Sequence, residues 1–118
     1  MLISKPYPLN EDYLVYENGT IEMNGVQLKQ RFVRRGERYL SVSMVIAGKQ
    51  RTRAVHRVVA YTFFGSPGAH FEVNHKDGNK LNNHISNLEY VTHRENMRHA
   101  AGLGILSRRK AGTELAIM

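Results

Sequence analysis

VNHKDGNKLNN occupies residues 73–83, and two further asparagines follow at positions 87 and 96. The cluster concentrates side chains that can bind a metal ion into a short stretch of a chain that has no cysteine. The turn at its centre contains Gly78, which can adopt the positive φ that a tight turn requires. A histidine beside an asparagine, with a further amide oxygen on a later element, is typical of a single-metal site that hydrolyses phosphodiesters. This stretch therefore predicts a tight turn and a metal-dependent hydrolytic site beside it.

The residues on either side of the stretch predict its frame. Residues 71–75 and 88–91 are short β-prone runs, and residues 79–87 lie between them as an irregular loop. Thr92 and Glu95 have the capping-box spacing, so a helix is expected to begin there. The order of strand, loop, strand and helix places the end of the first strand against the first turn of that helix.

The residues before this unit predict a small antiparallel sheet and one helix. Two Asn-Gly pairs, at residues 18–19 and 24–25, are hairpin-turn signals, and strands are expected over residues 26–33 and 39–46. Apolar residues then recur at helical spacing over residues 54–64, which predicts a short amphipathic helix. The predicted fold class is α+β, with a small N-terminal antiparallel sheet ahead of the strand–strand–helix unit.

Charge is distributed unevenly along the chain. The formal net charge is +7, from 17 Lys and Arg against 10 Asp and Glu. Residues 29–57 contain nine basic residues and one acidic residue, a net of +8, whereas residues 1–28 contain one base and four acids, a net of −3. A concentration of this kind predicts binding to a polyanion, most simply nucleic acid. A solvated face without a partner is the alternative.

The composition also bears on where the protein acts. The absence of cysteine excludes disulfides and thiolate metal sites, and it fits a reducing cytoplasm. The first residues lack the apolar core of a signal peptide, and no stretch approaches the roughly 20 apolar residues of a membrane span. We therefore expect a cytoplasmic protein that does not contact membranes.

Four motifs in order carry a family resemblance: VHRVVA at residues 55–60, NHxDGNxxNN at 74–83, NLExVT at 87–92, and Glu95-Asn96. With these motifs, residues 54–101 resemble the HNH endonuclease family, in particular its phage-type homing endonuclease branch. The resemblance implies a ββα-metal nuclease (His-Me finger) motif that hydrolyses phosphodiester bonds of double-stranded DNA. It implies nicking of one strand by a monomer in the cytoplasm of a bacterial host, with a dimer as the alternative.

The resemblance also implies roles for individual residues. Asn74 and Asn96 would be metal ligands, and the ion would be Mg²⁺, with Mn²⁺ as the alternative. His75 would be the general base, with its second ring nitrogen held by a backbone carbonyl. Asn87 would tie the loop together and so orient His75. The family usually has Asp or His at position 74, so two asparagines would bring no charge to the ion. A catalytically decayed DNA-binding protein is therefore the competing hypothesis.

The remaining polar residues divide into DNA contacts and loop structure. The domain organisation predicted is a basic β-sheet region at 1–53, the nuclease motif at 54–102 and a basic tail at 103–118. RNA binding is a third alternative, but the basic segment lacks an aromatic stacking platform. We assign Asn79, Asn82 and Asn83 to loop architecture and His56 to helix packing. The residues expected to contact DNA phosphates are Arg31, Arg34, Arg35, Arg38, Arg51, Arg53, Arg57, Lys76 and Lys80.

Overall fold

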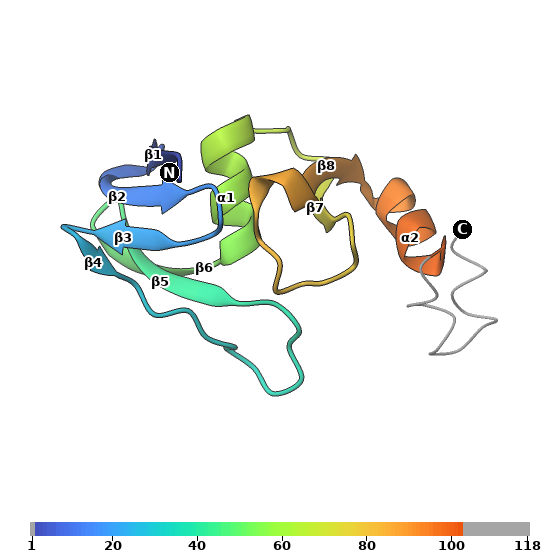
Figure 1. Cartoon of the computed structure of the whole chain (residues 1–118), viewed down its shortest axis with the longest axis horizontal. Helices are drawn as coiled ribbons and strands as arrows, with labels where there is room; N and C mark the ends of the chain where they lie inside the picture. Colours follow the sequence, from blue (N-terminus) through green and yellow to red (C-terminus); the bar gives the residue numbers. More distant parts are fainter. Residues whose placement is uncertain (1, 103–118) are drawn as a thin grey trace.

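The computed structural model describes residues 2–102, which form two small β-sheets, a central helix, and a hairpin followed by a second helix (Figure 1). The N-terminal sheet is antiparallel with the strand order β1-β2-β3-β4. Gly19 has a φ of 95° in the turn between its second and third strands, a conformation that favours glycine. The strands of this sheet are β1 (Ser4–Tyr7), β2 (Asn10–Tyr16), β3 (Ile21–Met23) and β4 (Val26–Gln27).

A second antiparallel pair leads directly into the central helix. Strands β5 (Ser41–Ile46) and β6 (Lys49–Ala54) are joined by a two-residue turn in which Ala47 and Gly48 both have positive φ, as the tight hairpin turn requires. Helix α1 (Val55–Phe64) follows β6 without a linker, and its first amide donates to the carbonyl of Leu40. The hairpin therefore determines where the helix begins.

The core lies where α1 meets both sheets. Val55, Val58 and Val59 recur at helical spacing and are buried, as the periodicity predicts. They pack against buried residues from the strands, and among residues 2–102 Leu88 is the one buried member of this cluster that follows α1. The other members of the core cluster are Tyr7, Tyr13, Val15, Ile21, Val42 and Met44.

The hairpin and second helix form the frame that the sequence predicts. β7 (Phe71–His75) pairs with β8 (Leu88–Thr92), and η1 (Ile85–Asn87) is a single 3-10 turn before β8. α2 (His93–Gly102) follows at once, and none of its residues is buried. The α+β fold class and the strand–loop–strand–helix order are therefore confirmed. No helix within residues 2–102 is long and apolar enough to cross a membrane.

The capping box is present in both directions. The Glu95 amide donates to the Thr92 hydroxyl at 3.2 Å, and the Thr92 amide donates to the Glu95 carboxylate at 2.8 Å. These bonds satisfy amides at the start of α2 that have no partner within the helix. The start of α2 is thus set by local sequence, and this fixes where Asn96 lies relative to the hairpin.

The N-terminal half differs from the prediction in three ways. β1 was not predicted, and the expected strand over residues 26–33 ends at Gln27. Residues 28–40 form an irregular loop, which contacts the sheets through the Leu28 amide, a donor to the Ile21 carbonyl at 2.8 Å, and through the bridge between Arg31 and Ser41. The strands also make separate sheets rather than one. The alternating pattern failed over this loop because Phe32 and Val33 stay 49% exposed, so no buried face stabilises a strand. The predicted tail at 103–118 lies outside the described residues.

Candidate active site

His75 ends β7 and is almost completely buried, with 3% of its surface exposed. Its Nε2 lies 2.8 Å from the side-chain oxygen of Asn83. Because an amide oxygen only accepts, Nε2 carries the proton and Nδ1 holds the lone pair. Burial lowers the pKa of His75, although the hydrogen bond that Nε2 donates to Asn83 acts in the opposite direction. The ring is therefore neutral at pH 7 and can accept a proton at Nδ1.

The partner of His75 corrects one expectation. A backbone carbonyl was implied at this ring nitrogen, whereas the structure places the side chain of Asn83 there. Asn83 is itself buried, and it packs against the N-terminal hairpin turn: a Cβ built on Gly19 would lie 3.0 Å from the Asn83 Cβ. The Ile85 amide also donates to the Glu17 carbonyl at 2.8 Å. The N-terminal sheet therefore positions the residue that orients His75.

Asn87 closes the loop between β7 and β8. Its side-chain oxygen accepts from the Asp77 amide at 3.0 Å, and its amide group donates to the Asp77 carboxylate and to the Asn82 carbonyl, each at 2.9 Å. Asp77 in turn accepts from the Asn79 amide and the Asn82 side chain. Asp77 is therefore a cap of this turn.

Asn74 lies one residue before His75 and is 6% exposed. It is paired with Glu89 across the hairpin, and its side-chain nitrogen donates to the Glu89 carboxylate at 2.8 Å. A carboxylate accepts and does not donate, so this contact determines which way the amide is turned. Oδ1 of Asn74 must point away from Glu89.

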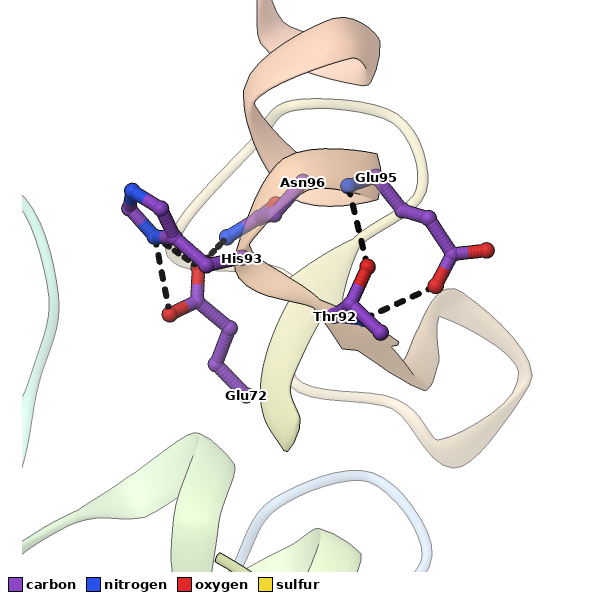
Figure 2. Close-up of polar contacts among 5 residues, drawn as sticks. All are labelled: Glu72, Thr92, His93, Glu95 and Asn96. Atoms are coloured by element: carbon purple, nitrogen blue, oxygen red, sulfur yellow. Dashed lines mark hydrogen bonds and ion pairs between the residues drawn. The ribbon is translucent and has the colours of Figure 1, made fainter. Parts of the chain in front are cut away.

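Asn96 has an equivalent arrangement on α2. Its side-chain nitrogen donates to a carboxylate oxygen of Glu72 at 2.6 Å, and His93 lies 3.2 Å from the other oxygen of the same carboxylate (Figure 2). Burial raises the pKa of Glu72, but the hydrogen bonds from Asn96 and His93 outweigh it and the pKa is lowered. Glu72 is therefore ionised at neutral pH and holds the Asn96 amide.

The amide oxygens of Asn74 and Asn96 fit a hard divalent ion. Neither oxygen accepts a hydrogen bond from another side chain or backbone amide within residues 2–102. The same part of the chain contains no cluster of three His, Cys, Asp or Glu residues that could hold a metal ion. Mg²⁺ prefers oxygen ligands and commonly retains several waters, so two protein oxygens are a compatible donor set.

A groove of about 650 Å³ joins the basic segment to Glu72, His75 and Asn96, whereas Asn74 does not line it. The loop over residues 28–40, β6 and the start of α1 contribute most of its remaining lining residues. Four of the predicted DNA contacts line it, namely Arg34, Arg53, Arg57 and Lys80. The other five do not line this groove: Arg31, Arg35, Arg38, Arg51 and Lys76.

His56 connects α1 to the site in a way that the sequence did not indicate. Its ring packs edge-on against His75, with the centroids 5.0 Å apart, and against Tyr39 at 5.4 Å. Burial, with a smaller contribution from His75, lowers the pKa of His56 to about 3. Its Nδ1 is the one sealed side-chain polar atom without a partner among residues 2–102. His56 is thus a neutral ring that supports His75.

The sequence analysis gave no role to two residues of the site, Glu72 and Glu89. It gave a different role to two others, His56 and Asn83. A signal existed for Glu89 alone, because the hairpin register places it directly opposite Asn74. Asn83 and His56 depend on contacts with distant elements, which no local pattern reveals.

The chain is similar to known proteins of one family. Residues 53–98 match the model of a family described as HNH endonuclease. The DNA endonuclease I-HmuI of Bacillus phage SP01 is 36% identical over 88 residues, which is 75% of this chain and 49% of the relative. YosQ, from the SPbeta prophage of Bacillus subtilis (strain 168), is 56% identical over 54 residues, which is 45% of this chain and 31% of the relative.

A solved structure matches most of the described fold. It is titled DNA binding and cleavage by the HNH homing endonuclease I-HmuI, with a TM-score of 0.75 and 31% identity. The match covers 87% of this chain and 60% of that chain. The chain spans between a fifth and a half of the length of the curated relatives it matches, from 20% to 49%.

Proposed function

Because this chain belongs to the HNH endonuclease family, we propose that it is a metal-dependent endonuclease that hydrolyses phosphodiester bonds of double-stranded DNA. The observation that carries the proposal is His75, whose ring is neutral, is held at one nitrogen by Asn83 and lines a basic groove. The likeness to I-HmuI, whose structure is titled for DNA binding and cleavage, supports the same substrate.

His75 is the general base of this reaction. A neutral imidazole with a free lone pair can take a proton from water as the water attacks phosphorus. The hydrogen bond from Nε2 to Asn83 keeps Nδ1 as the accepting atom and stabilises the ring as it becomes charged. Asn87 positions His75 indirectly, because its bonds to Asp77 and Asn82 hold the loop that begins at the end of β7.

Asn74 and Asn96 hold the divalent ion through their amide oxygens. Mg²⁺ is the ion we propose, and Mn²⁺ can occupy the same oxygen ligands. When bound, the ion supplies positive charge against the phosphate oxygens and the leaving oxygen.

The groove holds the DNA backbone. Arg34, Arg53, Arg57 and Lys80 supply four positive charges along it, against Glu37 and Glu72. Arginine binds phosphate through several parallel donors, so these side chains orient the strand as well as attract it. The remaining predicted bases, Arg31, Arg35, Arg38, Arg51 and Lys76, extend the positive surface outside the groove.

One His75 in each chain cuts one strand, so we propose that a monomer nicks duplex DNA. Its setting would be the reducing cytoplasm of a bacterial host, and its role that of a phage-type homing endonuclease, as the likeness to I-HmuI and to the prophage protein YosQ suggests.

Supercoiled plasmid incubated with the full chain tests the proposal. We expect open-circular product with Mg²⁺ or Mn²⁺ and none with EDTA. His75→Ala should reduce the nicking rate by about 10²–10⁴-fold, the usual contribution of a general base. His70→Ala, which removes an exposed histidine outside the groove, is the matched control. Absence of nicking at every metal concentration, or equal cutting by His75→Ala, would show that the proposal is wrong.

A second candidate, a DNA-binding protein that no longer cleaves, is motivated by Asn74 in place of a charged ligand. It predicts duplex binding that weakens steeply with salt, since counterions compete for the phosphates, and no nicking by the wild type. The plasmid experiment therefore separates the two candidates.

A further inference from the structure

We infer that Glu89 and Glu72 are positioning residues for the ion, each turning one amide oxygen toward it and supplying the negative charge that Asn74 and Asn96 lack. This inference rests on the proposed function, because ion binding by the two amides is part of that proposal. It assigns a role to two carboxylates that the family resemblance did not identify.

The Asn74–Glu89 contact is held by both strand register and burial. The two residues face each other in the β7–β8 ladder, and their side chains are 2.8 Å apart on the same face of the hairpin. Asn74 is buried, so its amide cannot exchange this partner freely for water. A hydrogen bond to an ionised acceptor is shorter and stronger than a neutral one, and it increases the electron density on the amide oxygen.

The Asn96–Glu72 contact repeats the arrangement from a different element. Glu72 lies two residues before Asn74 in β7, and so on the same face of the strand. Its carboxylate receives the Asn96 amide at 2.6 Å and is held from the other side by His93 (Figure 2). Two amides on different elements are therefore each held by a carboxylate of the hairpin.

The charge of the site follows from these contacts. Two neutral amides alone would leave a divalent cation without protein charge, whereas two carboxylates behind them contribute a formal charge of −2. Opposite charges a few ångströms farther away still attract an ion in a partly desolvated site. Partners that orient metal ligands typically contribute about 10–100-fold to metal affinity.

Binding of Mn²⁺ to the full chain without DNA tests the inference apart from activity. Glu89→Gln and Glu72→Gln keep an oxygen that can accept from the asparagine but remove the charge. We expect each to weaken Mn²⁺ binding by about 10-fold. Glu11→Gln, an exposed residue on β2, removes the same charge far from the site and is the matched control. Affinities within twofold of the control, or no Mn²⁺ binding by the wild type, would overturn the inference.

A reversal of the 74–89 pair separates a specific contact from a general loss of charge. Asn74→Asp alone places two carboxylates where the wild type has a hydrogen bond, so the metal-free melting temperature should fall. Adding Glu89→Gln restores the bond in the opposite direction, with glutamine donating to aspartate and the charge of the pair again −1. We expect the double variant to recover the melting temperature and to bind Mn²⁺ at least as tightly as Glu89→Gln alone. If the double variant recovers neither the melting temperature nor the Mn²⁺ affinity, the two residues are not coupled and the inference is overturned.

Plasmid nicking by the same proteins distinguishes failure of the inference from failure of the proposed function. If the wild type nicks DNA while Glu89→Gln and Glu72→Gln bind Mn²⁺ like Glu11→Gln, the function stands and the positioning role is wrong. If the affinities change as expected but the wild type does not nick DNA, the positioning role stands and the endonuclease proposal is wrong.

Discussion

The region before residue 65 and the region from residue 71 to 102 are stabilised by different interactions. The first contains nine of the ten residues in the buried core cluster, all of them apolar side chains or tyrosines. The second contributes Leu88 to that cluster, and α2 buries no residue. The loop between β7 and β8 in this second region is held by asparagine and aspartate side chains, which form hydrogen bonds to one another and to the backbone around Asn87.

The difference shows how stability and precision are divided in this small protein. Apolar packing is strong but tolerates changes of shape, whereas a hydrogen-bonded loop has its geometry set by a few directed contacts. The candidate site lies in the second region, where His75 and Asn74 must be placed accurately. The first region supports it through Gly19 and Glu17, which contact Asn83 and Ile85.

Ile21→Ala should have the largest effect on stability. Ile21 is completely buried in β3, and shortening a buried isoleucine to alanine typically costs about 2–5 kcal/mol. Urea denaturation measures the loss, and the nicking rate of the protein that remains folded should be unchanged. Val26→Ala, at a position 66% exposed, is the control in the same sheet. A variant with full stability but lost activity would contradict the division between the two regions.

Asn87→Ala should have the opposite profile. Removing its three side-chain hydrogen bonds frees the loop that holds His75, and a displacement of about 1 Å at a reacting group can reduce the rate by about 100-fold, or about 2.7 kcal/mol. The nicking assay measures this loss, and denaturation should show a smaller change than for Ile21→Ala.

Asn79→Ala serves as the control for Asn87→Ala in the same loop. Asn79 is exposed, and its side chain accepts one bond, from the Leu81 amide at 3.0 Å. It should retain activity close to that of the wild type. Equal losses from both variants would indicate that the loop responds to any substitution, not to the bonds of Asn87.

The free energy of unfolding should depend on pH through His56, the residue of α1 that packs against His75. The pKa of His56 is about 3 in the folded protein and close to 6.5 when unfolded, so the unfolded chain binds the extra proton between these values. The stability contribution is therefore complete above pH 6.5 and falls as the pH decreases toward 3, by up to about 1.4 kcal/mol per pH unit. Between pH 6.5 and 5 the loss should be about 1.6 kcal/mol, because the unfolded histidine is already half protonated at pH 6.5. The lowered pKa of His75 acts in the same direction.

His56→Phe isolates this contribution. Urea denaturation at pH 7, 6 and 5 should give a shallower slope for the variant than for the wild type. Tyr39→Phe keeps both histidines and the ring packed against His56, so it should retain the wild-type slope. Parallel slopes for the wild type and His56→Phe would mean that His56 is not the group that titrates.

Local patterns predicted those elements that local interactions stabilise. The capping box at Thr92 and Glu95 located the start of α2, and the valine spacing in α1 predicted its buried face. The loop over residues 28–40 was predicted wrongly because only Leu28 of its alternating apolar residues packs against the core, whereas Phe32 and Val33 stay about half exposed. β1 was missed although its pairing with β2 is local, because SKPY carries little β-propensity and no alternating pattern.

The sequence by itself determined the frame of the site: a hairpin and a capped helix that carry Asn74, His75 and Asn96, together with the excess of basic residues before α1. Spacing and capping are read over a few residues, so they need no knowledge of the fold. The tertiary structure alone decided the orientations. Asn83 faces His75 because Gly19 leaves room for it, and Glu89 and Glu72 turn the two amides because strand register and helix docking bring them within 3 Å. Orientation depends on contacts between distant residues, and those exist only once the chain has folded.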